Sequence, residues 1–210
     1  MRIINWDDAA AGNCFEHELC AVTVGVFDGV HRGHRELIKR ITGRRECSAE
    51  GSAADEGAAS GAALTPVIVT FRQNPRRLLF PHKETLDIIT LDEKLALFEQ
   101  AGIAACILID FSPAFASKSG ADFIRSLLVK MNMRLMVIGA NFCCGKGGSF
   151  NAAEIKAFAE TFDGGGTAGG AVCEIVPPVM DAGEPVSSSR IRAALANGDA
   201  RLAARLLGER

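Results

Sequence analysis

Val22–Leu37 has the sequence VTVGVFDGVHRGHREL, in which a strand, a turn and a helix start are expected in direct succession. Valine at the alternate positions 22, 24 and 26, with glycine at 25 and 29, is typical of a short buried strand that ends in a turn. His31 and His34 are three residues apart, so on a helix both rings lie on one face. The first turn of a helix has unpaired N–H groups and the positive end of the dipole, and imidazoles add hydrogen-bond donors. We therefore expect a polyphosphate site here, with Gly33 leaving the backbone open to the ligand.

Strands and helices are expected to alternate along the rest of the chain. The expected strands are Ala21–Val26, Pro66–Phe71, Ala105–Ile109, Leu135–Gly139 and Ala171–Val176. The expected helices are Gly33–Thr42, Leu91–Ala101, Gly120–Met131, Asn151–Phe162 and two short ones after Ser187. This alternation, with nearly continuous apolar strands, predicts an α/β fold: a parallel sheet of about five strands with helices on both faces. Ligands bind such sheets beyond the carboxyl ends of the strands, so the loops after the first, fourth and fifth strands are expected to meet in one site.

A second candidate anion site lies at Val186–Arg192, which reads VSSSRIR. Serines at a helix start cap the helix, and their hydroxyls and the neighbouring amides also suit phosphate oxygens. Arginine adds a planar cation that matches phosphate. The alternative interpretation is an ordinary capped amphipathic helix.

Composition limits the classes of protein that the chain can represent. The net charge of −2 gives no general attraction to nucleic acid or to an anionic membrane, so any anion site has to be local. No apolar run approaches the roughly 18–20 residues of a membrane span, and the N-terminus lacks the apolar centre of a signal peptide. Seven cysteines without a CxxC pair favour a reducing cytoplasm. We expect one domain over residues 1–210, with a flexible low-complexity insertion at 48–63, and the sequence gives no oligomeric state.

The phrase GVFDGVHRGH at Gly25–His34 resembles the signature of the HxGH nucleotidylyltransferases, and more closely the adenylyltransferase domain of bacterial FAD synthetases. Further similar segments follow in the family's order: Val69–Phe71 with Pro75, Leu91–Glu99, Val137–Phe142 with Gly145, and Val186–Arg192. The resemblance implies a Rossmann-like nucleotidylyltransferase fold. It also implies transfer of AMP from ATP to FMN, giving FAD and pyrophosphate, with Mg²⁺ offsetting phosphate charge. Family members commonly continue into a riboflavin kinase barrel, which we do not expect in these residues, so phosphorylation of riboflavin is not expected.

The resemblance also implies roles for individual residues. His31 and His34 would be catalytic, donating to phosphate oxygens and working best when at least one is protonated. The other contacts to ATP and its phosphates would come from Gly25, Phe27, Asp28, Gly29, Gly33, Ser188, Ser189 and Arg192. Flavin-binding residues would be Phe71, Asn74, Pro75, Asn141 and Phe142. No metal ligand is assigned, and Asp28 either shapes its turn or orients a histidine or a hydrated Mg²⁺.

Two departures from the family pattern bear on the flavin. Arg72, Gln73 and Asn74 stand where the family has an acidic residue followed by Pro-His, and Cys144 replaces a phenylalanine. Arg72, Arg76 and Arg77 are either phosphate ligands or solvated surface residues. The departures leave two alternatives to FMN adenylylation open. One is a related transferase acting on another phosphate ester, such as phosphopantetheine or nicotinamide mononucleotide, and the other is a nucleotide- or flavin-binding relative without turnover.

Overall fold

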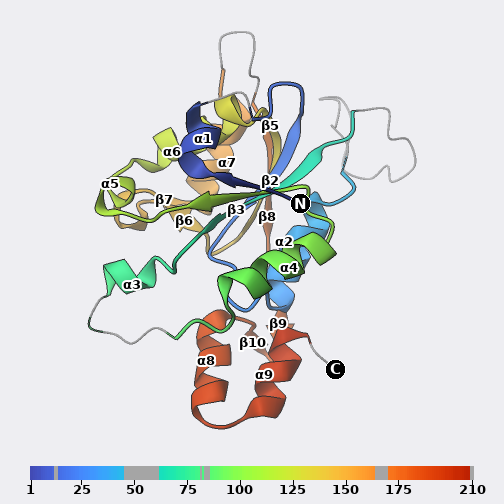
Figure 1. The fold of residues 1–210 in the computed structure, drawn as a ribbon, viewed down its shortest axis with the longest axis vertical. Helices are drawn as coiled ribbons and strands as arrows, with labels where there is room; N and C mark the ends of the chain where they lie inside the picture. The colour runs from blue at the N-terminus through green and yellow to red at the C-terminus, as the bar shows by residue number, and fades with distance from the viewer. Residues whose placement is uncertain (12–13, 45–61, 81, 83–85, 164–169, 209–210) are drawn as a thin grey trace.

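A six-stranded, entirely parallel sheet forms the centre of the described part of the chain (Figure 1). The structure is a computed structural model and describes residues 1–11, 14–44, 62–80, 82, 86–163 and 170–208. The strand order is β1-β4-β3-β2-β5-β8. The strands are β1 (Arg2–Asn5), β2 (Cys20–Val24), β3 (Thr65–Phe71), β4 (Ala105–Ile109), β5 (Met133–Gly139) and β8 (Val172–Val176). The expected parallel sheet is therefore confirmed. It has one strand more than the five that were expected, and the additional strand is β1.

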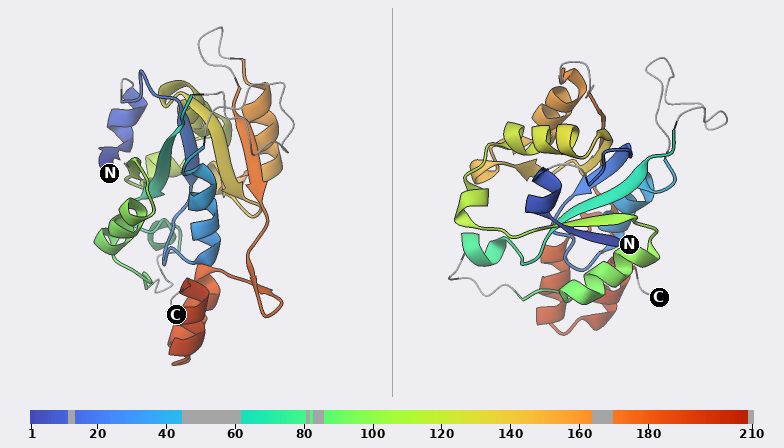
Figure 2. Two further views of the ribbon diagram at one scale, coloured as in Figure 1. Left: turned by 90° about the vertical axis from the view of Figure 1, so that its right-hand side faces the viewer. Right: turned by 45° about the horizontal axis from the view of Figure 1, so that its top comes forward.

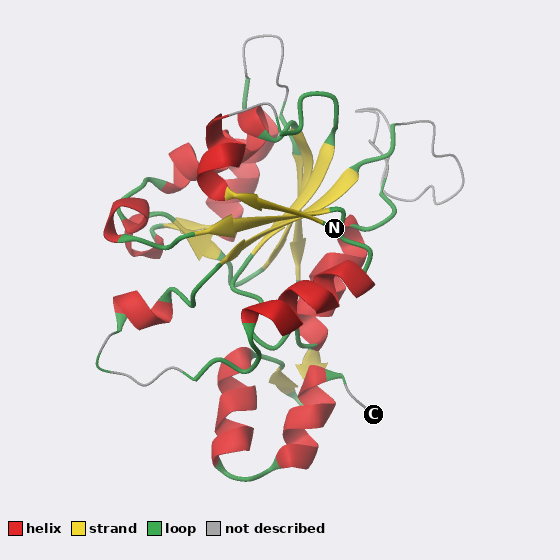
Figure 3. Ribbon diagram, viewed as in Figure 1, coloured by secondary structure: helices red, strands yellow, loops and turns green. Residues whose placement is uncertain are grey.

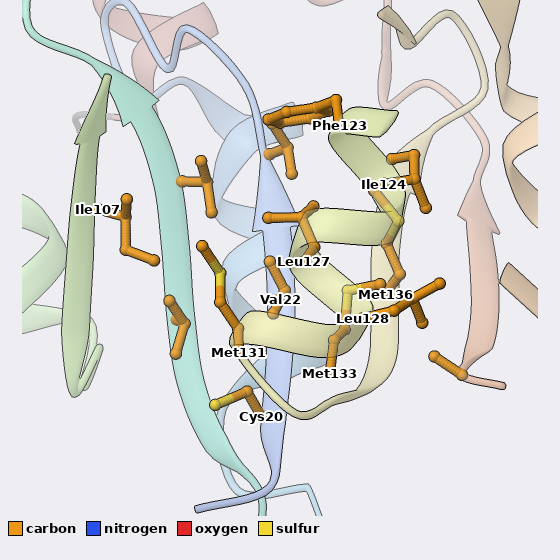
Figure 4. Packing of buried hydrophobic residues seen from close by; sticks show 14 of the residues in the cluster. Cys20, Val22, Ile107, Phe123, Ile124, Leu127, Leu128, Met131, Met133 and Met136 are labelled. Carbon is orange, nitrogen blue, oxygen red and sulfur yellow. The ribbon is translucent and has the colours of Figure 1, made fainter. Parts of the chain in front are cut away.

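Two helical layers cover the sheet (Figure 2). One face packs against α1 (Trp6–Ala11), α6 (Gly120–Lys130) and α7 (Ala152–Thr161). The other packs against α2 (Arg32–Ile41) and α4 (Leu91–Gln100). Side chains of β2 alternate between the layers: Val22 and Val24 join the core under α6, and Ala21 joins the core under α2. Figure 4 shows Leu127 and other α6 side chains facing β2, which is buried along its whole length.

The last two helices form a hairpin at one end of the molecule (Figures 1 and 3). These are α8 (Ser188–Ala196) and α9 (Ala200–Leu207), which share a small apolar cluster of their own. Asp181 ties the hairpin to the sheet domain, because its carboxylate accepts hydrogen bonds from Arg32 on α2, Arg190 on α8 and Arg205 on α9. The hairpin is therefore held against the start of α2.

The remaining elements are short. They are α3 (Arg76–Leu79), α5 (Pro113–Ala116), the 3₁₀ turn η1 (Lys146–Gly148) and the small strand pairs β6 (Cys143–Cys144) with β7 (Phe150–Asn151) and β9 (Met180–Asp181) with β10 (Glu184–Pro185). Most of the insertion expected at 48–63 lies outside the described residues. No helix in the described ranges combines the length and apolar character needed to cross a membrane.

Candidate functional site

A cleft of about 390 Å³ lies beyond the carboxyl ends of β2, β5 and β8. The chain leaves β2 toward β3 and β4 on one side and later returns to β5 and β8 on the other, so the cleft lies where the strand order reverses. The loops after these three strands and the start of α8 line it together, as expected. The expected site residues that line the cleft are Gly25, Phe27, Asp28, His31, Gly33, His34, Asn74, Asn141, Phe142, Ser188, Ser189 and Arg192.

Three expected site residues do not line the cleft. Gly29 has a φ of +85°, and a Cβ there would lie 3.2 Å from side-chain atoms of Ile88 and Leu207, so it serves the turn and its packing. Phe71 packs edge-on against Phe111, with ring centroids 5.6 Å apart, in an aromatic cluster beside the sheet. Pro75 is buried at the start of α3. These three residues lie outside the lining of the cleft, and their assignment to ligand contacts stays a prediction.

The two histidines form a stacked pair at the start of α2. Their ring centroids are 3.6 Å apart and their planes differ by 15°. His31 is the N-cap residue, and its Nδ1 accepts a hydrogen bond from the backbone N–H of His34 at 3.4 Å. An uncharged His31 ring with Nδ1 as acceptor carries its hydrogen on Nε2, which is then a donor. The spacing argument is confirmed, with the refinement that the first histidine caps the helix.

Burial keeps the pair uncharged in the ligand-free protein. It lowers the pKa of His31 to about 4. The pKa of His34 also falls well below its usual value, because of burial and then the neighbouring charges of His31 and Lys94. Nδ1 of His34 is buried and has no hydrogen-bond partner among the described residues. At neutral pH neither ring is protonated without ligand, so the protonated form expected from the resemblance requires a bound anion to favour it.

The turn between β2 and α2 has an unusual backbone. Phe27 is fully buried at a φ of +54°, a left-handed conformation that is rare for a bulky residue. Its ring contacts that of His34, with centroids 5.0 Å apart. A Cβ at Gly33 would lie 3.3 Å from the ring of His31, so a side chain here would press on that ring, a contact that the sequence did not reveal. The strained backbone at Phe27 therefore places its ring against His34 and helps to fix the position of the imidazoles.

The start of α8 faces the same cleft. Ser187 caps the helix by accepting from the N–H of Arg190 at 3.2 Å. The hydroxyl of Ser188 donates to the carbonyl of Asp28 at 2.9 Å, whereas the hydroxyl of Ser189 has no hydrogen-bond partner among the described residues. Arg192 pairs with the Asp28 carboxylate and donates to the carbonyl of Leu86 at 2.9 Å. The two motifs, about 150 residues apart, are therefore in direct contact.

Both oxygen atoms of the Asp28 carboxylate have partners within the fold. Besides the Arg192 pair, its Oδ1 accepts from the N–H of Ile88 at 2.8 Å. Asp28 is the only carboxylate among the described residues that line the cleft. Across all described residues, no group of three or more His, Cys, Asp or Glu side chains is placed to hold a metal ion. These contacts fit the turn-shaping interpretation of Asp28.

The segment that departs from the family pattern is well satisfied in the fold. Arg72 pairs with Asp110 at 3.0 Å and donates to the side-chain oxygen of Asn5 at 2.7 Å. Asn74 is buried, donates to Asp87 at 3.3 Å and accepts from the backbone N–H at the start of α3 at 3.1 Å. Cys144 is half-buried and packs against the main core. Arg72 and Asn74 thus have partners within the fold, and of these three residues only Asn74 lines the cleft.

The structure separates the three arginines that follow Phe71. Arg72 is paired as described, and Arg77 pairs with Asp87 at 2.6 Å. Arg76 lines the cleft and forms no ion pair within the described ranges, with its guanidinium 5.9 Å from the ring centroid of Phe80. Of the three, Arg76 is the one available to an anion in the cleft.

Residues 177–179 belong to the loop after β8 and line the cleft, as expected for the loop after the fifth predicted strand. Sequence reasoning missed Lys94, which lies near the cleft without lining it. Lys94 is buried on α4 and donates to oxygen atoms at the ends of β2 and β3. Its signal was present in the sequence, since Lys94 falls on the apolar stripe of Leu91, Leu95 and Phe98.

Comparison with known proteins gives a consistent result. A family model described as FAD synthetase matches residues 15–190. The bifunctional riboflavin kinase/FMN adenylyltransferase of Bacillus subtilis (strain 168) is 33% identical over 195 residues, covering 92% of this chain and 55% of that protein. The protein of the same name from Escherichia coli (strain K12) is 30% identical over 194 residues, covering 91% and 55%. A solved structure described as a macrolide-efflux protein from Streptococcus pneumoniae has a TM-score of 0.75 and 28% identity, covering 100% of this chain and 62% of that one. The chain thus spans just over half the length of these curated relatives.

Proposed function

The chain belongs to the FAD synthetase family, and from that premise we propose that it transfers the adenylyl group of ATP to FMN, forming FAD and releasing pyrophosphate. One observation carries the proposal: two helix N-termini line a single cleft. The start of α2 contributes the histidine pair, and the start of α8 contributes Ser189 and the neighbouring Arg192. Two positive helix ends facing one cavity suit a ligand with several phosphates.

The reaction requires little covalent chemistry from the protein. An oxygen of the FMN phosphate forms a bond to the α-phosphorus of ATP. The bond from that phosphorus to the oxygen bridging the α- and β-phosphates breaks, and the electron pair leaves with pyrophosphate. The attacking oxygen is already anionic, so neither a side-chain nucleophile nor a general base is needed. The protein positions the two phosphates and stabilises the charge that develops on the leaving group.

His31 and His34 act as hydrogen-bond donors in this scheme. The Nε2–H of His31 is the donor that the cap geometry specifies. Both rings are uncharged in the free protein. When phosphate oxygens bind beside them, the negative charge favours uptake of a proton by the pair, which then donates stronger hydrogen bonds to the phosphates. Phosphate binding and protonation are then coupled, with Arg192 and the α8 start acting on the other side of the triphosphate.

Mg²⁺ enters the proposal as part of the substrate MgATP. A magnesium ion in nucleotide sites commonly keeps several waters and is held mainly by phosphate oxygens. This agrees with the contacts of Asp28, whose carboxylate is engaged by Arg192 and Ile88. No step of the mechanism depends on a protein ligand to the ion.

Asn74, Arg76, Asn141 and Phe142 are the residues that we propose for the FMN side of the cleft. Arg76 supplies a cation for the FMN phosphate, and Phe142 supplies an apolar surface for the flavin ring. We also propose that residues 1–210 act as one adenylyltransferase unit in the cytoplasm, with ATP and FMN as partners. The six described cysteines, which are all free thiols, support a reducing compartment.

The decisive experiment measures pyrophosphate release from MgATP with FMN, phosphopantetheine, nicotinamide mononucleotide or no acceptor. FMN-dependent release of pyrophosphate with formation of FAD supports the proposal. Faster release with another ester would show that this ester, and not FMN, is the acceptor. ATP binding without pyrophosphate release on any ester indicates a non-catalytic relative. His31→Ala and His34→Ala should each lower turnover by orders of magnitude with an unchanged circular dichroism spectrum. Rates like those of the wild type in both variants would rule out the histidine role.

A further inference from the structure

Lys94 is a buried cation that the mechanism above does not use. It lies on α4 with only 8% of its surface exposed, on the same helix face as Leu95 and Phe98. A lysine is rarely fully buried unless a partner repays the lost hydration of its charge. Its surroundings therefore need an explanation beyond packing.

Three oxygen atoms surround the Lys94 nitrogen. Nζ donates to the carbonyls of Phe71 at 2.9 Å and Val26 at 3.3 Å, and to the hydroxyl oxygen of Thr70 at 3.3 Å. The Thr70 hydroxyl in turn donates to the Val26 carbonyl at 3.1 Å, so its lone pairs face the lysine. An ammonium has three N–H donors, whereas an uncharged amine has two. The geometry therefore matches the charged form of Lys94.

These contacts join the two strand ends that form the back of the cleft. Phe71 ends β3, and Val26 follows β2 and directly precedes Phe27, whose strained backbone supports the His34 ring. Lys94 thus bridges from α4 to the base of the histidine turn. Loss of the ammonium would leave two buried carbonyls without this donor.

No described carboxylate forms an ion pair with Lys94. The acids nearest in electrostatic effect are Asp28 and Asp87, and each is already paired, with Arg192 and Arg77 respectively. The Cys106 thiol and the His34 ring are the other titratable groups that interact with it. Burial lowers the pKa of Lys94, as expected for a cation without a direct counter-ion. The charge of Lys94 is therefore not neutralised by a direct partner, and it lies behind a cleft that is also lined by two helix N-termini.

We propose that Lys94 is a positioning residue that fixes the ends of β2 and β3 behind the histidine turn and supplies positive charge that a bound polyphosphate balances. The polyphosphate part rests on the proposed function. Lys94 acts through the turn and through its field, and its side chain does not line the cleft.

The first test measures binding of inorganic triphosphate by calorimetry, with Lys130→Met on the exposed end of α6 as the matched control. Lys94→Met should weaken binding on the order of tenfold, which corresponds to about 1.4 kcal/mol. Lys94→Arg, which keeps the charge, should bind within about threefold of the wild type, and Lys130→Met should be unchanged. Equal affinities of Lys94→Met and the wild type would overturn the proposal, as would failure of the wild type to bind triphosphate.

The second test uses NMR titration and needs no catalysis. In the wild type, saturating triphosphate should raise the pKa of Lys94, and an unchanged value would overturn the proposal even if Lys94→Met did not fold. In folded Lys94→Met the pKa of His34 should rise, because a nearby positive charge has been removed. The response of the wild-type Lys94 pKa to triphosphate is the readout that a purely structural lysine would not give. If Lys94 responds to triphosphate but FMN is not adenylated, the proposed function fails and this inference stands. If FMN is adenylated but the pKa of Lys94 does not respond to triphosphate, the proposed function stands and this inference fails.

Discussion

Acid should destabilise this protein through protonation of His31, and a variant without this ring can separate its effect from that of the other titrating groups. The pKa of the His31 ring falls from its ordinary value of 6.5 to about 4, mainly because the ring is buried. Below about pH 6.5 the unfolded chain binds a proton at this position, and the folded chain does not until about pH 4. The free energy of unfolding therefore falls as the pH drops through this window, and is affected little above pH 7.

The size of the effect follows from the same two values. A difference of about 2.5 pH units at ~1.4 kcal/mol per unit gives ~3 kcal/mol when the ring is fully titrated in both states. At pH 5, where the folded ring is still mostly uncharged, the loss is ~2 kcal/mol relative to pH 7.5. This is a large share of the 5–15 kcal/mol that is typical for a domain.

The assay is urea unfolding of the wild type and of His31→Asn at pH 7.5 and at pH 5. Asparagine is a favoured N-cap residue, so the variant keeps a cap on the first turn of α2 without a titrating ring. His34 and the carboxylates titrate in both proteins, so the wild type should lose ~2 kcal/mol more than the variant between the two pH values. Equal losses would refute the argument, because His31 would then not be a buried, uncharged cap.

Three further predictions concern other parts of the site and the fold. Arg76→Ala should raise the KM for FMN about tenfold with the KM for ATP unchanged, whereas the paired Arg77 should tolerate alanine; steady-state kinetics with each substrate varied will show this. Gly145→Ala should cost about 2 kcal/mol or more in urea unfolding, since φ is +78° and a Cβ would lie 2.5 Å from a backbone nitrogen, and Gly147→Ala, with open space, should cost less. Asp181→Asn should speed hydrogen exchange in α8 and α9 but not in the central strands, because it weakens contacts to three arginines; uniform exchange rates in the variant and the wild type would contradict this.

The central sheet could be predicted because its signal is local. The five expected strands are continuous apolar runs, and the structure places each within one or two residues of the expected bounds. The strand β1 was missed because its four residues form an edge strand that pairs only with β4 and is largely exposed, so it needs no apolar run. The short helices α3 and α5 were missed for a similar reason, since four residues do not establish a helical period.

The site could be predicted only as far as motif and topology extend. The histidines and the α8 serines were located because helix starts and strand ends have recognisable sequences. The Asp28–Arg192 pair depends on how residues 164 positions apart meet, and nothing in either motif specifies that contact. The same limit applies to Gly29 and Phe71, which do not line the cleft: a residue within a motif can also pack in the turn or in an aromatic cluster beside the cleft.

The distribution of charge decides how this cleft can attract an anion. The chain as a whole carries a net charge of −2, and both imidazoles are uncharged at neutral pH, so neither provides the attraction in the free protein. Arg192 is partly neutralised by Asp28. The remaining sources are two helix N-termini, which need no protonation, and the cations Arg76 and Lys94. Recognition should therefore begin with groups whose charge does not vary near neutral pH. Imidazole protonation follows binding, because phosphate oxygens are what make the buried rings basic enough to take up a proton.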